Sequence, residues 1–257
     1  MVVALNVESI SFAYSNKPVL KNISVKINSG SLCAILGGNG SGKTTFIKCI
    51  NKLLSPQSGR ILLNDNDINQ LSHNEVAKLV SYVPQEHDNI LPYPVIEVVV
   101  MGVSPYLSVG QIPNAEHYQF ARDVLSKLNA RYLETKQFNQ ISGGERQIAL
   151  IARALVQKSP IMLLDEPSNH LDFSRKSLLM NLLRNICSQE NKTIVTTTHD
   201  PNLISSVADH VIMLKDGEVF CEGFTENVLQ SNNISEIYDV DIETVRDDCG
   251  RNLFFAR

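Results

Sequence analysis

The segment GGNGSGKTT at residues 37–45 constrains the fold most, because it packs glycines around one lysine directly after the apolar run 32–36. Gly37, Gly42, Lys43 and Thr44 have the spacing G-x-x-x-x-G-K-[S/T] of a phosphate-binding P-loop. Backbone N–H groups and the start of a helix form an anion site in such a loop. The apolar run before it and the helical pattern after it favour a nucleoside-phosphate site over an ordinary glycine-rich turn. The residues expected to contact the nucleotide are Gly37, Gly38, Asn39, Gly40, Ser41, Gly42, Lys43, Thr44 and Thr45.

Charged and hydroxyl side chains in two segments predict the chemistry of this site. Lys43 would reach the β- and γ-phosphates, and the hydroxyl of Thr44 would be a ligand of Mg²⁺. Residues 161–166 read IMLLDE, an apolar strand that ends in two carboxylates. Beside a magnesium nucleotide, Asp165 would hold the metal and Glu166 would orient or deprotonate the attacking water. Alone this pattern is a plain strand end, but after a P-loop it indicates nucleotide hydrolysis.

Composition excludes several other classes of protein. The 257 residues carry a formal net charge of −4, whereas general nucleic-acid binding requires a basic face, so we expect no nucleic-acid partner. No apolar run approaches the roughly 20 residues of a membrane span, and the N-terminus lacks the features of a signal peptide. The five cysteines include no C-x-x-C pair, which suits free thiols in a reducing cytosol. We expect a soluble, cytosolic chain whose membrane role depends on a partner.

Hydrophobic periodicity predicts alternating strands and helices. Strand-like runs lie at 2–7, 23–27, 32–36, 80–83, 161–165, 193–197 and 210–214, with antiparallel-type alternation at 9–14 and 22–27. Helical patterns lie at 43–53, 73–79, 142–157, 175–189 and 201–207. Strands followed by helices favour an α/β fold with a mainly parallel sheet and the phosphate loop at a strand's carboxyl end. Strand signals are absent from about 88 to 141, where helical patterns at 94–102 and 115–129 predict a helical insertion.

A third motif, ISGGERQ at residues 141–147, places Ser142 and two glycines at the start of a helical pattern. By itself this motif would be only a capped helix. The order P-loop, S-G-G-E and L-L-D-E resembles the nucleotide-binding subunit of ATP-binding cassette (ABC) proteins over essentially the whole chain. The resemblance implies one P-loop NTPase domain over 1–257, with a parallel core, an antiparallel β subdomain and a helical subdomain at about 88–158. It also implies ATP and Mg²⁺ as ligands and ATP hydrolysis as the reaction.

The resemblance assigns roles to further residues. Tyr14 is similar to the aromatic that stacks on adenine, with a core strand aromatic as the alternative. Gln85 resembles the Q-loop glutamine, which senses Mg²⁺ and the attacking water, and residues 168–172 resemble the D-loop that crosses to the opposite subunit. His199 resembles the switch histidine at the γ-phosphate, although a lone histidine after a strand is more often structural. The residues implied to contact the γ-phosphate of the opposite subunit are Ser142, Gly143 and Gly144.

The signature departs from the usual L-S-G-G-Q of the family at two positions. Ile141 replaces leucine with a similar volume. Glu145 places a carboxylate in the first helical turn, which is favourable for the helix dipole but unfavourable beside a triphosphate. Since the serine and both glycines are retained, we expect a functional site.

One P-loop and one signature in the chain predict dimerisation, because in the family two cassettes face head to tail around two ATP molecules. We expect a homodimer, or a dimer with a paralogue. The stretches 71–85, 93–107 and 236–240 resemble cassettes of iron–siderophore, haem and cobalamin importers. This implies a subunit at the cytoplasmic face of the inner (cell) membrane that energises multi-span permease subunits. A periplasmic or extracellular substrate-binding protein would take part indirectly.

Two alternatives stay open at this point. S-G-G-E also occurs in soluble ABC ATPases without a permease, such as iron–sulfur cluster assembly ATPases. An exporter cassette is disfavoured, because exporter cassettes are commonly fused to their membrane domain. The motifs name no cargo.

Overall fold

The computed structural model describes residues 2–85, 92–169, 171–247 and 252–257. Its centre is a sheet in which β9, β3, β8, β7 and β6 are parallel and β10 is antiparallel to β9. Side by side, the strands are β10 (Glu218–Phe224), β9 (His210–Lys215), β3 (Leu32–Leu36), β8 (Thr193–Thr198), β7 (Ile161–Leu164) and β6 (Val80–Val83). The inner strands are buried on both faces, as continuous apolar runs predict. This confirms the predicted α/β P-loop fold with a parallel core.

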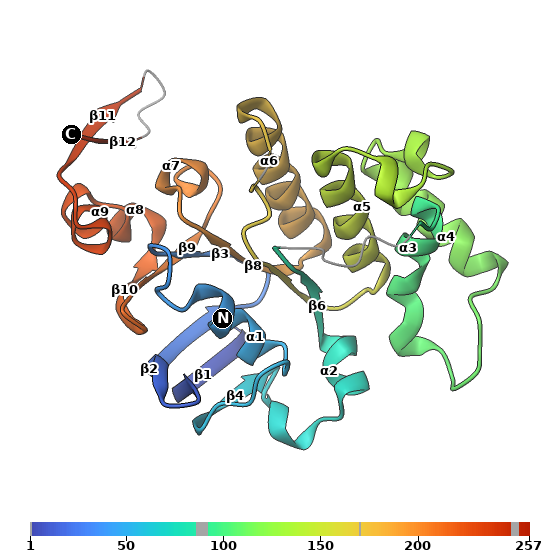
Figure 1. Cartoon of the computed structure of the whole chain (residues 1–257), viewed down its shortest axis with the longest axis horizontal. Coiled ribbons are helices and arrows are strands. Elements are labelled where there is room, and N and C mark those ends of the chain that lie inside the picture. Colours follow the sequence, from blue (N-terminus) through green and yellow to red (C-terminus); the bar gives the residue numbers. More distant parts are fainter. Residues whose placement is uncertain (1, 86–91, 170, 248–251) are drawn as a thin grey trace.

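A second, antiparallel sheet lies beside the first and is built mainly from the N-terminal residues (Figure 1). In spatial order its strands are β2 (Lys17–Asn28), β1 (Val3–Tyr14), β4 (Ser58–Leu63) and β5 (Asn66–Asp67). Helix α1 (Lys43–Ile50) packs between the two sheets, because its apolar residues share one buried cluster with residues of β1, β2 and β3. The P-loop therefore connects β3 to a helix that is enclosed by both sheets.

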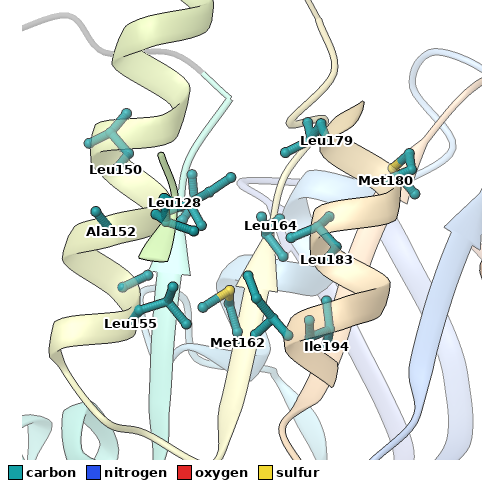
Figure 2. Close-up of a cluster of buried hydrophobic side chains, with 14 of the residues drawn as sticks. Leu128, Leu150, Ala152, Leu155, Met162, Leu164, Leu179, Met180, Leu183 and Ile194 are labelled. Carbon is teal, nitrogen blue, oxygen red and sulfur yellow. The ribbon is translucent and has the colours of Figure 1, made fainter. Parts of the chain in front are cut away.

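Helices α5 (Gly143–Val156) and α6 (Phe173–Glu190) cover the other face of the parallel sheet, and α3 (Val95–Val100) and α4 (Ala115–Lys127) pack against α5. Helix α2 (His73–Leu79) lies on the side of α1, because its buried Val76 belongs to the same apolar cluster as α1 and the antiparallel sheet. Short 3-10 turns lie at η1 (Ile68–Gln70), η2 (Met101–Tyr106), η3 (Arg131–Leu133) and η4 (Phe138–Gln140). Figure 2 shows side chains of α5 and α6, among them Leu155 and Leu183, converging on Met162 and Leu164 of β7. The strand that ends at the two carboxylates is thus held by apolar contacts from two helices.

The C-terminal part packs at the end of the sheet formed by β10 and β9. Its elements are α7 (Pro201–Ile204), α8 (Thr225–Val228), α9 (Ser231–Tyr238) and the antiparallel pair β11 (Ile242–Arg246) and β12 (Asn252–Ala256). Among the described residues, no helix combines the length and the apolarity that a membrane span requires.

Comparison with the sequence expectations gives agreement in the core and corrections elsewhere. Each predicted helical pattern coincides with a helix whose ends differ by a few residues, and 94–102 continues as the 3-10 turn η2. The ranges 2–7 and 9–14 are one strand rather than two, because β1 continues through a shift in register next to Ser9, which has a φ of 52°. Strands β4, β5, β10, β11 and β12 were not expected. The helical subdomain boundaries at about 88–158 stay a prediction.

Candidate functional site: a phosphate loop beside two carboxylates

The P-loop needs glycine at two positions for different reasons. Gly42 has a φ of 102°, in the left-handed region, and forms the cap of α1. A Cβ on Gly37 would lie 2.5 Å from the backbone oxygen of Leu214 on β9. Any larger residue would therefore be strained at Gly42 and would collide with β9 at Gly37. The loop follows β3 directly, so these two glycines lie at the carboxyl end of that strand. This is the edge of the sheet at which α/β proteins bind their ligands.

Lys43 is 5% exposed and its ammonium lies against the loop from which it starts. Its Nζ donates to the backbone oxygens of Gly37 (2.9 Å) and Gly38 (3.0 Å) and lies 3.5 Å from Oε1 of Glu166. A buried cation is tolerated because a carboxylate and two carbonyl oxygens surround it. Lys43 is thus placed to meet an anion in the loop.

Asp165 is buried at the end of β7 and joins the P-loop to β8. Its Oδ1 accepts hydrogen bonds from Oγ1 of Thr44 (3.1 Å) and Oγ1 of Thr197 (2.7 Å). Its other oxygen, Oδ2, is buried and has no hydrogen-bond partner among the described residues. Since an unsatisfied buried carboxylate oxygen is costly, this atom is suited to a cation or its water.

Asp165 and Thr44 fit a magnesium nucleotide better than a free metal. Mg²⁺ prefers oxygen ligands and is usually bound by one or two protein groups together with substrate phosphates. No group of three His, Cys, Asp or Glu side chains able to hold a metal occurs in the described part of the chain. A metal at Asp165 would therefore arrive with phosphate oxygens.

Glu166 is 8% exposed and is held from three sides. Its Oε2 accepts from Nδ2 of Asn169 (2.6 Å) and lies 3.2 Å from Nδ1 of His199, while Lys43 approaches Oε1. Burial alone would raise the pKa of Glu166. The hydrogen bond from Asn169 and the charges of Lys43 and His199 outweigh burial, so the pKa lies below its usual value of 4.5. The carboxylate is therefore ionised at neutral pH.

A pocket of about 230 Å³ opens over these groups. Its lining joins Lys43 and Glu166 to Gln85 and to Val19 of β2. The other residues that line the pocket are Asn39, Gly40, Gly42, Thr44 and Thr45. Val19 was not predicted from the sequence, although its backbone oxygen lies 3.0 Å from the position of a Cβ on Gly42.

Tyr14 ends β1 and is not a core aromatic. Its side chain is 47% exposed and packs edge-on against Phe12, with ring centroids 4.9 Å apart. It lies outside the pocket lining, and its place at the adenine stays a prediction. Of the predicted D-loop 168–172, His170 lies outside the described residues.

The signature residues form a separate, self-contained structure at the start of α5. Ser142 is the N-cap, and its hydroxyl accepts from the backbone N–H of Glu145 (3.3 Å). Oε2 of Glu145 accepts in return from the N–H and the hydroxyl of Ser142, both at 2.9 Å. The glutamate that departs from the usual signature thus completes a capping box.

The charge of Glu145 is also balanced locally. Nζ of Lys136 lies 3.3 Å from its Oε1. The backbone N–H and the hydroxyl of Ser142, together with Lys136, hold the pKa of Glu145 below its usual value against the effect of burial. The structure therefore gives the glutamate two partners within its own chain.

The signature and the P-loop lie apart within one chain. None of Ser142, Gly143 and Gly144 belongs to the lining of the P-loop pocket, as far as the described residues define it. Figure 1 shows α5 on the far side of β8 and β7 from α1. Ser142 and Gly143 are exposed, whereas Gly144 is buried near Leu171 and Arg175.

Comparison with known proteins identifies the family. A family profile described as ABC transporter matches residues 20–169, which carry the P-loop, the signature and the two carboxylates. The chain belongs to the ABC transporter family. It is an ATP-binding cassette, and cassettes of this family bind and hydrolyse ATP and work as dimers with membrane permease components.

Relatives of the cassette are similar over nearly their whole length. A protein of Helicobacter pylori strain 26695 named for iron chelatin transport is 36% identical over 245 residues, which are 95% of this chain and 96% of that protein. A petrobactin import ATP-binding protein of Bacillus subtilis is 32% identical, with 93% and 94% of the two chains covered. A solved structure described as a metal-chelate type ABC transporter, in an inward-facing conformation, has a TM-score of 0.88 at 29% identity, with 100% and 98% covered.

Proposed function

We propose that this cassette powers the import of iron chelates of the siderophore type by hydrolysing ATP at two sites of a homodimer. The observation that carries the ATPase part is the buried cluster of Lys43, Asp165 and Glu166, in which Lys43 and Glu166 line one pocket and Asp165 is hydrogen-bonded to Thr44 of its lining. The relatives named for iron chelatin and petrobactin transport support the class of cargo.

Hydrolysis would use groups that the fold already holds in place. Glu166 is ionised, and Asn169 and His199 fix its Oε2, so it could orient or deprotonate a water on the γ-phosphate. Lys43 would exchange its contact with Glu166 for a phosphate, which frees the carboxylate for this task. With the nucleotide bound, Mg²⁺ would supply neutralisation of phosphate charge, and Thr44, Asp165 and Gln85 are the residues that would hold it.

Each site would be completed by the signature of the second subunit. Ser142, Gly143 and Gly144 start a helix, and a helix N-terminus favours a negatively charged group. The exposure of Ser142 and Gly143, and the separation of all three residues from the P-loop of their own chain, support contact with the γ-phosphate of a partner cassette. Closing the dimer would bring positioning and charge neutralisation together, which is most of what phosphoryl transfer requires.

The permease would dock on the helical part near Tyr93 and Tyr106. These tyrosines are 44% and 48% exposed, and Met101 between them is 43% exposed. The aliphatic residues of α3 do not contribute to this surface, since they are buried against α4 and α5. Residues 86–91 lie outside the described residues. The docking surface is thus confined to a few exposed side chains.

Docking of this kind would hold the cassette at the cytoplasmic face of the cell membrane, next to permease subunits that receive cargo from an external binding protein. The alternative of a permease-free ATPase, such as an iron–sulfur assembly ATPase, has less support, because the relatives in the comparison carry transport names.

The test combines Tyr93→Asp and Tyr106→Asp with uptake of a radiolabelled ferric siderophore into vesicles that hold the cassette and the permease encoded beside it. We expect normal basal ATPase of the isolated cassette, weaker association with the permease and loss of uptake. Tyr132→Asp is a matched control, because Tyr132 is similarly exposed but lies outside the stretch 93–107. Normal uptake by the folded variants would contradict the docking surface. Absence of any co-purifying multi-span protein would contradict the transporter assignment.

A further inference from the structure

The stretch 236–240, EIYDV, has no part in the site described above, although it stood out in the sequence. We call it the tail segment. It ends α9 and is anchored to the end of β9 by Lys215, whose Nζ contacts Oε1 of Glu236 (3.0 Å) and Oδ1 of Asp239 (2.9 Å). Nζ of Lys215 also donates to the backbone oxygen of Glu236. The tail segment therefore has a fixed position on the parallel sheet.

This position borders the phosphate loop. The backbone oxygen of Ile237 lies 3.8 Å from the position that a Cβ on Gly38 would take. Ile237 is 5% exposed and belongs to the main apolar core, so its position is fixed by packed side chains. The backbone of the tail segment thus lies beside the P-loop.

The tail segment also holds the loop that carries His199. The hydroxyl of Tyr238 donates to the backbone oxygen of His199 at 2.7 Å. Burial raises the pKa of Tyr238, and the charges of Asp200 and Glu166 raise it further, so the hydroxyl keeps its proton and remains a donor at neutral pH. The ring of the same histidine lies close to the buried carboxylate, with its Nδ1 3.2 Å from Oε2 of Glu166. The tail segment is therefore bonded directly to the backbone of the proposed switch residue.

A second contact joins the same loop to the C-terminal hairpin. Nδ2 of Asn202 donates to the backbone oxygen of Phe254, and its Oδ1 accepts from the N–H of Phe254, both at 2.9 Å. Asn202 is the second residue of α7 and comes soon after His199 in the chain. Its partner Phe254 is buried. Figure 1 shows β11, β12 and α9 gathered beside α7. The residues after the switch histidine are therefore held at two points by the C-terminal part of the chain.

We propose that Tyr238 is a positioning residue for hydrolysis: through the backbone of His199 it fixes the imidazole relative to Glu166 and to the phosphate loop. The proposal rests on the proposed role of His199. The tail segment would then link the positions of the two loops, because it lies beside the P-loop and is hydrogen-bonded to the switch loop.

Tyr238→Phe tests this directly, because it keeps the ring and removes only the hydroxyl. In the full-length cassette we expect kcat for ATP to fall about fivefold, the effect of one hydrogen bond, while KM changes less than about twofold. Tyr118→Phe is a matched control, since it removes a hydroxyl that donates to Glu97 over the same 2.7 Å in the helical part. The control should leave kcat unchanged.

A double-mutant cycle with His199→Ala separates positioning from a general loss of structure. We expect His199→Ala to lower kcat and the addition of Tyr238→Phe to cause no further loss. If Tyr238→Phe lowered kcat equally in both backgrounds, or in neither, the positioning role of Tyr238 would be overturned. The switch role of His199 would be unaffected by that result. Unchanged kcat in His199→Ala would overturn the switch role itself.

Lys215→Gln is a second variant for the case in which Tyr238→Phe does not fold. It releases the tail segment from its exposed side and should lower kcat in the wild-type background but not beside His199→Ala. An unchanged kcat in folded Lys215→Gln would contradict a bracing role of the tail segment.

Discussion

Lys43 and Glu166 on the P-loop side are 5% and 8% exposed, whereas Ser142 and Gly143 on the signature side are open to solvent. The buried pair is held by groups from the P-loop, from the loop after β7 and from the loop after β8. The hydrogen bonds that hold the signature, in contrast, join Ser142 to Glu145 in one capping box, so they span only four residues. Buried charges require the whole fold to compensate them, but a capping box requires only the start of a helix.

The comparison teaches that, under the proposed mechanism, one chain would build one half of the site completely and present the other half outward. The P-loop half has the proposed catalytic carboxylate, its lysine partner and an unsatisfied carboxylate oxygen in one place. None of the signature residues lines the P-loop pocket of its own chain, as far as the described residues define it. Changes in the buried half should therefore act within a subunit, and changes in the exposed half should act on the partner.

The largest expected effect on ATP binding is that of Lys43→Ala. The change removes the buried cation and leaves Glu166 without its closest charge, so affinity should fall by about a hundredfold or more. Equilibrium binding of a fluorescent ATP analogue measures this. Lys48→Ala, on the same helix but outside the pocket, is the control. Unchanged affinity in Lys43→Ala would remove the P-loop assignment.

Glu166→Gln should separate binding from turnover. Glutamine keeps the shape and can still contact Asn169 and His199, but it cannot act as a base, so turnover should fall by about 10²–10⁴ while ATP binding persists. The closed dimer should then accumulate with Mg-ATP and appear in gel filtration. A monomer with normal hydrolysis would sink both the role of Glu166 and the dimer mechanism.

The two glutamates should also affect the acid limb of the stability curve, which is the fall in the free energy of unfolding between neutral pH and about pH 3. Glu166 and Glu145 both have a pKa below the usual 4.5, so each stabilises the fold above that value, and the contribution is lost as the pH falls through the lowered pKa. Urea unfolding of Glu166→Gln and Glu145→Gln, followed from neutral pH to about pH 3, measures the loss. Both variants should flatten the acid limb. A steeper limb in either would reverse the sign of its pKa shift.

The smallest expected effect is that of Glu145→Gln on nucleotide affinity. Because Lys136 already pairs with the carboxylate, and exposed pairs are worth little, KM for ATP should change by less than about twofold. Lys136→Ala should have the larger effect, since it leaves the negative charge unpaired near the partner's phosphates. Steady-state ATPase kinetics decide between them. A large gain in affinity from Glu145→Gln alone would show that the charge is not balanced locally.

The parts of this site that could be predicted from sequence are those whose residues are neighbours in the chain. Lys43 and Thr44 stand in one motif, and Asp165 and Glu166 end one apolar strand, so spacing alone reveals them. The bridge from Thr197 to both Asp165 and Glu166 could not be predicted, because it depends on the parallel pairing of β7 with β8. Val19 is in the pocket for a similar reason, since the antiparallel sheet brings β2 to Gly42.

The fold was predictable where burial leaves a periodic pattern. The strands of the parallel core are apolar runs that no helix of the same length would explain. β11 carries mostly exposed residues and has no such pattern, so the hairpin that holds Asn202 was not expected. The left-handed residue Ser9 interrupts the alternation of β1 in the same way, which made one strand look like two.

The most direct test of the central claim is an ATP-dependent cross-link between the two halves. Two cassette variants in the Glu166→Gln background would be mixed, one with Ser142→Cys and one with Asn39→Cys, both at exposed positions. We predict a disulfide-linked dimer in the mixture with Mg-ATP, and none in either variant alone beyond the background of the native cysteines. A mixture that stays monomeric under mild oxidation with Mg-ATP would contradict an ATP site shared between subunits.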